Sequence, residues 1–570
     1  MNLKHIRVRN FRGIKEMDWH IDGRIICMVG PGDSTKTTIL DAIELTLLPR
    51  GYVSLSDCDF HKGNIEAPII IEITIGDVPA ELRTDEKYGL YLRGYDNKGQ
   101  LQDEPADGLE PVLTLRFEVD KNLEPVWQAW KPTLPEPRPI SWRDRLKLAM
   151  ARLGNDVDRH LTWGRGSALA RITDTEKAAA STLVEMGRVA QKVFADKSLS
   201  ELQAAATKAK EAAKKLGAKT DALRPGIDSQ AFSFGSAILG LHDDTVPIRS
   251  FGLGTKRLVA VAVQQIALGQ GTILLVDEIE HGLEPHRIRQ LLKQLRANLA
   301  PEGQAFGQVM MTSHSPTPIF ALSVQDLRFV RNEAGVTKIA KADPALLSVV
   351  QRIVRQRGHA LLARKVLVCE GKTEEALCRV LDGACAPGHQ GESFAFHGVV
   401  ALEGGGCTDA PLVAQELKRW GYDVALLADS DRPLKPDANA VSALGVNVIQ
   451  WDGSTSTEER LVADLPWGTV QTFIDKAMTL EGNAAVLDQV GKHLGGSLHG
   501  MGNDINAWAS GKWDQAAVRT AIGQAAKAGE WFKDLNSGQE LGEIAVAALP
   551  HMTGTDFAEK ISLLERWIYA

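Results

Sequence analysis

The 570-residue sequence has few cysteines, few tyrosines and no excess of positive charge. Its six cysteines are scattered without a C-x-x-C pair, which excludes a zinc ribbon and a disulfide framework and predicts reduced thiols in a cytoplasmic protein. The 65 Lys and Arg residues against 72 Asp and Glu residues give a net charge of −7. This balance excludes a uniformly basic nucleic-acid-binding surface but allows a local basic channel. Six tyrosines, none in an evident catalytic context, disfavour covalent topoisomerase chemistry.

Long apolar runs are also missing. No stretch approaches a membrane-spanning length, and the N-terminal segment MNLKHIRVRNFRGIKE has no apolar core, so we expect neither a membrane span nor a secretory signal. The chain is 44% hydrophobic and 24% charged, which is typical of a folded globular protein. At roughly 150 residues per domain, the length predicts three to four folding units.

Hydrophobic periodicity divides the chain into five segments. They are an α/β segment at 1–142, a helix-rich insertion at 143–230, an α/β segment at 231–350, a second α/β block at 351–475 and a helical region at 476–570. The insertion contains Arg171–Leu216, which lacks proline and is dense in Ala, Lys and Glu, so it predicts one or two long helices. Such helices would form either a dimerisation arm or a lid packed on their own domain.

A phosphate-binding loop is predicted between the apolar run ending at Val29 and the helix-like segment TTILDAIELTLL. The residues expected to contact a nucleotide are Gly30, Gly32, Ser34, Thr35, Lys36, Thr37 and Thr38. In this pattern backbone N–H groups and the helix dipole face the phosphates, the lysine reaches the β- and γ-oxygens, and a hydroxyl (here Thr37) holds Mg²⁺. The G-x-x-x-x-G-K-[ST] pattern is broken once, because Thr35 replaces the second glycine and its side chain could crowd the nucleotide.

Two further segments would complete an ATPase site. The apolar strand Ile273–Val276 ends in Asp277 and Glu278. The first carboxylate could hold Mg²⁺ through water, and the second could position or deprotonate the attacking water. His314 follows another strand and could hydrogen-bond a γ-phosphate, although a lone histidine there would as readily be an ordinary loop residue. Together with the loop, these residues predict an ATPase.

A second set of carboxylates follows strands of the 351–475 block. They stand at strand ends or one turn into the following helix and are Glu370, Glu374, Asp429 and Asp431. Parallel strands end at the same edge of a sheet, so these side chains would share one crevice, where divalent cations would offset their repulsion. Oxygen-only ligands favour Mg²⁺ or Mn²⁺, and such ions suit phosphodiester cleavage.

Several of these motifs resemble those of a known ATPase class. The segment Asn10-Phe11-Arg12-Gly13-Ile14, followed by KTTILDAI, resembles the start of ABC-type ATPases of the SMC and DNA-repair class. That resemblance implies that Arg12 approaches the phosphates. The segment from Gly252 to Arg257 (GLGTKR) is similar to their signature motif, which would bring Gly254 to the ATP site of a second subunit, although Gly252 replaces the signature serine.

The motif E-G-x-x-E, followed by a strand and D-x-D, resembles the Toprim fold of topoisomerases, primases and certain nucleases. An ABC ATPase followed by a Toprim domain resembles the OLD (overcoming lysogenization defect) family of ATP-dependent endonucleases. The implied fold is α/β multidomain: an ABC-type ATPase (1–142 and 231–350) with a helical dimerisation insertion (143–230), a Toprim nuclease core (351–475) and a helical C-terminal part (476–570).

The resemblance also implies a further acidic residue and a late lysine in the Toprim site. Glu458 is the candidate for the acid, with Glu459 beside it; a solvated helix start explains either residue equally well. Lys533 is the candidate for the lysine, which would stabilise charge developing on phosphorus, and Lys560 is the alternative.

The sequence therefore predicts an ATP-binding DNA endonuclease or nickase that depends on Mg²⁺ or Mn²⁺ and whose ATPase module gates the Toprim nuclease. The resemblance implies a bacterial or phage setting in antiviral defence, DNA as substrate, a homodimer or higher homo-oligomer and a defence partner protein encoded nearby. The alternative is an ATPase sensor or scaffold that binds DNA or a partner effector without cleaving DNA. Because of Thr35 and Gly252, ATP could be hydrolysed or only sensed.

Overall fold

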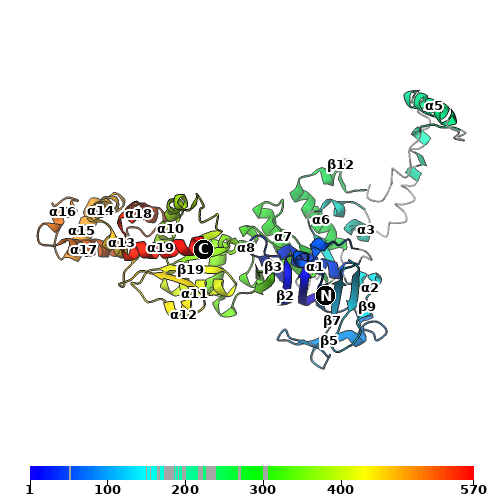
Figure 1. The fold of residues 1–570 in the computed structure, drawn as a ribbon, viewed down its shortest axis with the longest axis horizontal. Coiled ribbons are helices and arrows are strands. Elements are labelled where there is room, and N and C mark those ends of the chain that lie inside the picture. The colour runs from blue at the N-terminus through cyan, green and yellow to red at the C-terminus, as the bar shows by residue number, and fades with distance from the viewer. Residues whose placement is uncertain are drawn as a thin grey trace.

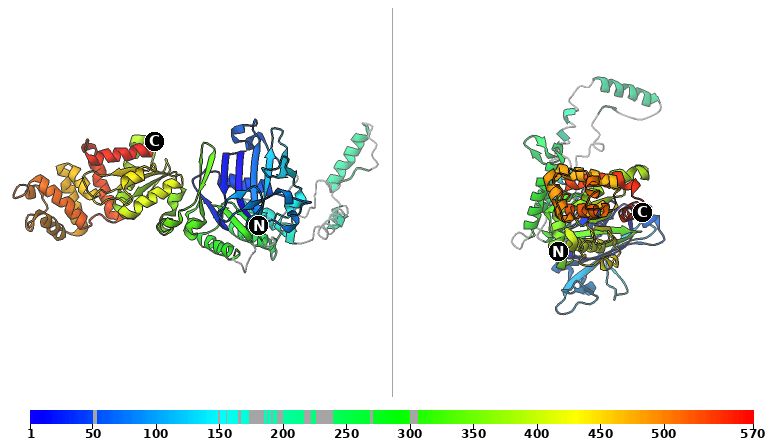
Figure 2. Two further views of the ribbon diagram at one scale, coloured as in Figure 1. Left: turned by 90° about the horizontal axis from the view of Figure 1, so that it is seen from below. Right: turned by 90° about the vertical axis from the view of Figure 1, so that its left-hand side faces the viewer.

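The structure is a computed structural model with two lobes that lie side by side along its longest axis (Figures 1 and 2). It describes residues 1–49, 53–148, 150–154, 156–163, 167–172, 185–186, 188–189, 192–194, 200–215, 222–225, 239–267, 271–299 and 306–570. The N-terminal lobe is built on one large mixed sheet, and the C-terminal lobe, from about residue 365 onward, is built on a small parallel sheet followed by helices.

Five strands form the parallel part of the large sheet. In spatial order they are β10 (Met150–Leu153), β13 (Thr272–Val276), β14 (Phe306–Thr312), β3 (Ile25–Val29) and β15 (Leu327–Glu333). Every residue of β3 and β13 is buried, as expected for parallel strands covered on both faces. The helices of this part are α1 (Lys36–Leu47), α3 (Ala168–Ile172), α6 (Leu253–Ala267), α7 (Pro285–Ala297), α8 (Pro316–Ala321) and α9 (Leu347–Arg357).

The sheet continues into a mainly antiparallel part. Its strands are β16 (Val336–Ala340), β2 (Ile14–His20), β1 (Asn2–Phe11), β4 (Ile69–Gly76), β7 (Glu110–Val119), β5 (Leu92–Tyr95) and β6 (Leu101–Gln102), with β8 (Pro125–Ala129) and β9 (Arg138–Pro139) beside β7. β1 alternates apolar and polar residues: Leu3, Ile6 and Val8 enter the core, whereas the charged residues between them line the opposite face. Short α2 (Trp142–Leu146) and the β11–β12 hairpin (His242–Asp243 and Val246–Pro247) complete this lobe.

The C-terminal lobe has a four-stranded parallel sheet in the order β18-β17-β19-β20. These strands are β18 (Val399–Glu403), β17 (Lys365–Cys369), β19 (Asp423–Ala428) and β20 (Asn447–Gln450), with helices α10 (Lys372–Cys385), α11 (Gly406–Arg419) and α12 (Ala438–Ser442) between them. Seven helices follow: α13 (Thr457–Asp464), α14 (Trp467–Glu481), α15 (Asn483–Leu494), α16 (Ile505–Ala509), α17 (Gln515–Ala528), α18 (Leu535–Ala548) and α19 (Asp556–Tyr569). They pack on the sheet through one apolar core.

The two lobes share buried contacts. Phe329 of β15 stacks on Trp420, with ring centroids 3.8 Å apart, and both side chains are buried. Arg331, also on β15, lies over the ring of Tyr422 and donates a hydrogen bond to the carbonyl of Ala363. One apolar core therefore runs from the nucleotide-loop sheet into the small parallel sheet.

The predicted fold class is confirmed: the protein is a mixed α/β chain with a large sheet and a helical C-terminal region. The structure differs from the predicted segmentation at β10, which lies inside the expected insertion at 143–230 yet pairs with β13 in the main sheet. A four-residue strand is too short to show a period of its own. Of the long helices predicted within Arg171–Leu216, the structure describes α5 (Ser200–Lys215), which stands apart from both lobes in Figures 1 and 2, and most of the rest lies outside the described residues.

No helix among the described residues is long and apolar enough to cross a membrane. All six cysteines are free, and Cys369 and Cys378 lie in the core with their sulfurs 3.9 Å apart.

Candidate functional site

The predicted nucleotide loop lies between β3 and α1. Lys36 is almost wholly buried, and its Nζ donates hydrogen bonds to the carbonyls of Gly30 (3.1 Å) and Pro31 (2.7 Å) and to Oγ of Ser34 (3.0 Å). Burial lowers the pKa of Lys36 to about 8. Gly32 and Thr37 are exposed at the surface of the loop, and the first turn of α1 (Lys36, Thr37, Thr38) carries no acid, so its positive dipole end is open to an anion.

Thr35 takes the left-handed conformation that glycine adopts more easily, with φ at 68°. Its hydroxyl donates to the carbonyl of Ser34 at 2.6 Å and lies 3.0 Å from Oγ1 of Thr337 on β16. Its methyl group faces Gly13, where a Cβ would lie 2.9 Å from Cγ2 of Thr35. The threonine side chain therefore points toward β16 and Gly13.

Asp277 is the centre of a network that the sequence only partly indicated. Its Oδ1 accepts hydrogen bonds from Thr37 (3.1 Å) and Thr312 (2.7 Å). Its Oδ2 accepts from Arg152 at 3.0 Å. The guanidinium of Arg152 also pairs with Asp41 at 2.6 Å and with Glu44 at 3.2 Å, both on α1. Arg152 thus fixes the carboxylate beside the predicted magnesium-binding hydroxyl.

The remaining ATPase candidates surround this centre. Glu278 has a left-handed backbone (φ 46°), its N–H donates to Oγ1 of Thr312, and its half-exposed carboxylate lies 3.5 Å from His281. The backbone N–H of His314 donates to Glu280 at 2.6 Å. Burial and the nearby Lys36 ammonium lower the pKa of His314, which favours its neutral imidazole.

Arg257 in α6 was not anticipated as a positioning residue. It is fully buried and donates to the carbonyls of Asp277 and Glu278, the latter at 2.8 Å. Gly254 in the same helix packs against Gly282: a Cβ at Gly254 would lie 2.6 Å from the Gly282 carbonyl oxygen. A side chain at Gly252 would meet no atom within 4 Å among the described residues, so a serine would fit there.

Arg12 does not point freely into the loop. Its guanidinium pairs with Asp41 on α1 and, at 2.9 Å, with Asp59. Asp41 is also a partner of Arg152, so Arg12 joins the loop after β1 to the Asp277 network through one shared carboxylate.

The second carboxylate cluster lies at the carboxyl ends of β17 and β19. Oε2 of Glu370 accepts a hydrogen bond from the backbone N–H of Asp429 at 3.0 Å. Glu374 lies one turn into α10, where its Oε2 accepts from the N–H of Gly371 at 2.8 Å. Oδ1 of Asp429 accepts from the N–H of Thr457 at 2.8 Å. Three segments spread over more than 80 residues of chain therefore come together here.

Thr457 joins two of these carboxylates. Its hydroxyl oxygen lies 2.7 Å from Oε1 of Glu374 and 2.8 Å from Oδ1 of Asp429, and it accepts from Nε1 of Trp451 at 2.7 Å. A hydroxyl carries one hydrogen, so it can donate to only one of the two carboxylates. The other contact requires a proton on the second carboxyl group or a cation beside it.

The pKa values of the acidic residues also indicate that this cluster needs positive charge nearby. Burial, reinforced by the Glu374 charge, raises the pKa of Glu370 to about 7. Burial and the neighbouring carboxylates also raise the pKa values of Glu374 and Asp429. Glu458 is fully buried, and within the described residues neither of its oxygens accepts a hydrogen bond. Its partner is Nζ of Lys533 at 3.3 Å.

Lys533 is the cation that faces Glu458 in this cluster. Burial disfavours its charge, but the carboxylates of Glu458, Glu374 and Asp429 raise its pKa, so it stays an ammonium. Lys560, the alternative lysine, instead pairs with Asp452 at 3.1 Å and with Asp556 at 3.7 Å.

Asp431 and Glu459 share a cation that the sequence did not reveal. Nζ of Lys527, at the end of α17, lies 3.0 Å from each carboxylate. Asp431 thus faces the same edge of the sheet as Glu370 but is neutralised by Lys527 rather than by Lys533.

The donors of this cluster have the chemistry that a hard divalent cation prefers, but no three of the described carboxylates bring ligand atoms within 4.8 Å of one another, so these side chains would have to move closer to share an ion. The donors are carboxylate oxygens only, and two of them, on Glu458, accept no hydrogen bond from the described residues. Burial, together with the neighbouring negative charges, raises the pKa values of Glu370, Glu374 and Asp429. The residues that would hold the cation are Glu370, Glu374, Asp429 and Glu458, with Asp431 at the rim.

Comparisons with known proteins found a matching family model and a curated relative. A family model described as "AAA domain, putative AbiEii toxin, Type IV TA system" matches residues 25–317. The curated OLD nuclease of Thermus scotoductus (strain ATCC 700910 / SA-01) is 25% identical over 417 residues, which are 65% of this chain and 71% of the relative. The OLD resemblance expected from the sequence is therefore confirmed.

Among solved structures, the SmcHead bound to the C-winged helix domain of ScpA is 15% identical, with a TM-score of 0.34 over 60% of this chain and 98% of the solved one. The recombination mediator protein RecF with ATP is 14% identical, with a TM-score of 0.32 over 60% of this chain and 99% of the solved one.

Proposed function

The chain belongs to the AAA domain family whose model spans its residues 25–317, and we propose that it is an ATP-binding, divalent-metal-dependent DNA endonuclease or nickase of the OLD type. The observation that carries this proposal is the linked set of three carboxylates: Glu374 and Asp429 share the hydroxyl of Thr457, and Glu370 accepts a hydrogen bond from the backbone N–H of Asp429. A buried acidic cluster of this kind destabilises the fold unless it holds a cation, so a function must maintain it.

The carboxylates of Glu370, Glu374, Asp429 and Glu458 would bind Mg²⁺ or Mn²⁺, which supplies an activated water and charge for the leaving oxygen when bound. The protein's own groups prepare this site. Thr457 holds Glu374 and Asp429 at a fixed separation, and the Asp429 N–H orients Glu370. Lys533 remains protonated beside Glu458, where its ammonium would stabilise negative charge developing on the phosphate.

The N-terminal lobe would bind ATP in its loop. Lys36 would leave the loop carbonyls for the β- and γ-phosphates, the N-terminus of α1 would face the phosphates, and Thr37 with Asp277 would hold Mg²⁺. Glu278 would position the attacking water, and Arg257 would hold the backbone of that carboxylate pair. Arg12, His314 and Gly254 would complete the site, the last from a second subunit.

The gating part of the proposal rests on contacts between the lobes. Thr35 in the loop contacts Thr337 on β16, and β15 beside it carries Phe329 and Arg331 onto the C-terminal lobe. A cavity of about 810 Å³ lies between these parts and is lined by Ser34, Arg331 and Trp420, among others. A change in the loop on nucleotide binding would therefore reach the strands that carry Glu370 and Asp429.

The alternative, an ATPase sensor or scaffold that binds DNA or a partner effector without cleaving DNA, is favoured by one observation. Asp277 is fully engaged by Thr37, Thr312 and Arg152, so nucleotide-bound Mg²⁺ would have to share it. In either case the proposed partners are DNA, a second copy of the chain and a defence protein encoded nearby, and the proposed setting is cytoplasmic antiphage defence.

The test is conversion of supercoiled plasmid to nicked or linear DNA in Mg²⁺ or Mn²⁺, with and without ATP. The variants are Glu370→Ala and Asp429→Ala, with Asp452→Ala as the matched control because Asp452 follows the neighbouring strand but pairs with Lys560 on the surface. We expect cleavage by the wild type and Asp452→Ala and none by the first two variants. Intact plasmid with the wild type in every metal and nucleotide condition would contradict the nuclease and favour the scaffold.

A further inference from the structure

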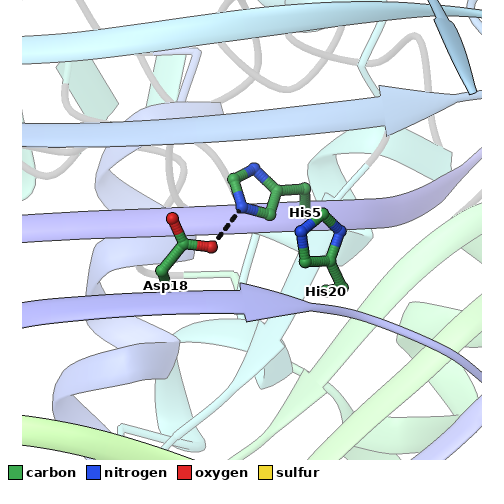
Figure 3. Close-up of side chains that lie close together, drawn as sticks. All are labelled: His5, Asp18 and His20. Atoms are coloured by element: carbon green, nitrogen blue, oxygen red, sulfur yellow. Dashed lines mark hydrogen bonds and ion pairs between the residues drawn. The ribbon is translucent and has the colours of Figure 1, made fainter. Parts of the chain in front are cut away.

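The polar face of the antiparallel part of the large sheet carries a cluster that the ATPase and nuclease sites do not use. His5 on β1 lies directly opposite His20 on β2, and Asp18 lies opposite Arg7 two pairs further along the same two strands. Because residues two apart on a strand point to the same face, His5, His20 and Asp18 come together on one surface. Figure 3 shows these three side chains gathered side by side.

The ligand atoms of this cluster already lie at short distances. One ring nitrogen of each histidine and one carboxylate oxygen of Asp18 all lie within 4.8 Å of one another. The imidazole rings of His5 and His20 are 4.4 Å apart, and Nε2 of His5 lies 2.7 Å from Oδ1 of Asp18. A tetrahedral ion with bonds of 2.0–2.1 Å requires ligand atoms about 3.3 Å apart, which small rotations of these side chains provide.

The surroundings orient the carboxylate ligand through its second oxygen. Arg7 binds Oδ2 of Asp18 at 2.9 Å, so it fixes the carboxylate while Oδ1 stays directed at the histidines. The next acid in this row, Glu72, is engaged by Arg116 at 2.5 Å, and Arg93 is engaged by Asp103 at 2.5 Å. Arg93 and Arg116 therefore have carboxylate partners outside the cluster, and Arg7 is the cation that contacts Asp18.

The cluster opens into a cavity of about 480 Å³. His5 is buried at its base, whereas Asp18 and His20 are exposed. This arrangement leaves room for a water or a small anion as a fourth ligand. Open transition-metal sites have the same composition, with three protein ligands and one exchangeable ligand.

We propose that His5, Asp18 and His20 form a binding site for a borderline transition-metal ion of the Zn²⁺ and Co²⁺ type, which clamps β1 to β2. Two imidazoles and one carboxylate select such ions over Mg²⁺ or Ca²⁺, which prefer oxygen ligands alone. The site is distinct from the carboxylate cluster of the C-terminal lobe and does not depend on the proposed nuclease activity.

The experiment is a titration of the metal-stripped full-length protein with Co²⁺, followed by the visible absorption of low-coordinate Co²⁺ with nitrogen ligands. The variants are His20→Asn and Asp18→Asn, and His242→Asn is the control because His242 is an exposed histidine on the β11–β12 hairpin. The double variant Glu370→Gln/Asp429→Asn removes two carboxylates from the cluster of the C-terminal lobe. It therefore distinguishes Co²⁺ bound by the histidines from Co²⁺ bound by that oxygen-only cluster.

We expect the wild type, His242→Asn and the double carboxylate variant each to bind one Co²⁺ per chain with this absorption. His20→Asn and Asp18→Asn should bind Co²⁺ at least tenfold more weakly. Zn²⁺ should displace the bound Co²⁺ from the wild type. Zn²⁺ should also raise the Tm of the wild type but not of folded His20→Asn. No visible band in the wild type, or a band of equal affinity in His20→Asn, would overturn the site.

Discussion

The fully buried carboxylate of Glu458 faces Nζ of Lys533 at a distance of 3.3 Å. Glu458 lies in the first turn of α13 and Lys533 lies between α17 and α18, so the pair joins two parts of the helical region of the C-terminal lobe. Because Glu458 accepts no hydrogen bond from the described residues, this cation is its main compensation for burial. The charge of the same lysine also interacts with the carboxylates of Glu374 and Asp429.

Replacing Lys533 tests whether this cation acts on the phosphate. Lys533→Ala should lower plasmid cleavage by about 100-fold or more, because one preorganised positive group at a developing charge supplies an effect of this size. Lys560→Ala should cleave like the wild type, because Lys560 pairs with Asp452 and Asp556. Cleavage rates from the time course of nicking provide the measurement. An equal loss of cleavage rate in both variants would mean that Lys533 is not the lysine that stabilises the phosphate.

Thr457 provides a subtler change in the same cluster. Thr457→Val keeps the shape of the side chain but removes the hydroxyl between Glu374 and Asp429 and leaves Nε1 of Trp451 without its acceptor. We expect a loss of about 2 kcal/mol in the free energy of unfolding and weaker binding of Mn²⁺. Thr457→Ser should restore both quantities in denaturant titrations and metal titrations. If Thr457→Val bound Mn²⁺ as tightly as the wild type, the hydroxyl would have no role in holding the carboxylates.

The stability of the metal-stripped protein should depend on pH through Glu370. Its pKa is raised from 4.5 to about 7, so the folded state binds this proton more tightly than the unfolded state. The resulting stabilisation is present below pH 4.5 and is lost as the pH rises through about 7. In EDTA, the wild type should therefore lose more Tm between pH 5.5 and pH 8 than Glu370→Gln does. Parallel Tm curves for the two proteins would contradict the raised pKa.

Arg152 makes a prediction for the N-terminal lobe. Arg152→Ala leaves Asp277, Asp41 and Glu44 without their shared cation, so it should cost about 3 kcal/mol of stability and weaken ATP binding. Arg152→Lys should retain part of the stability and part of the ATP binding. Glu278→Gln, at the half-exposed rim, should suppress phosphate release without that loss of stability, whereas Lys36→Ala should suppress phosphate release and also leave the carbonyls of Gly30 and Pro31 without their donor. Background phosphate release from the wild type would mean that ATP is sensed and not hydrolysed.

The sequence located those residues whose position follows from a local rule. Strand ends of a parallel sheet meet at one edge, so Glu370 and Asp429 could be paired from the hydrophobic runs before them, and Glu374 followed from one helical turn. Lys36 and Thr37 followed from the loop pattern in the same way.

Residues that act through tertiary packing left no such signal. Arg152 reaches Asp277 across 125 residues from a strand too short to recognise, and Lys527 reaches Asp431 only because α17 folds back on the small sheet. Lys533 and Lys560 look alike in sequence, since a lysine has no periodic partner, and the packing of α13, α17 and α19 distinguishes them. The pair His5 and His20 depends on the register of β1 and β2, which is fixed by the short turn at Arg12–Gly13.

The most direct measurement for the central claim is Mn²⁺ binding by the metal-stripped protein, counted by electron paramagnetic resonance at pH 8 without nucleotide. The comparison is between the wild type and Glu370→Gln/Asp429→Asn, which preserves side-chain shape while removing two negative charges from the cluster. The account predicts that the wild type binds at least one more Mn²⁺ per chain than the double variant. Identical Mn²⁺ stoichiometry and affinity in the two proteins would contradict it.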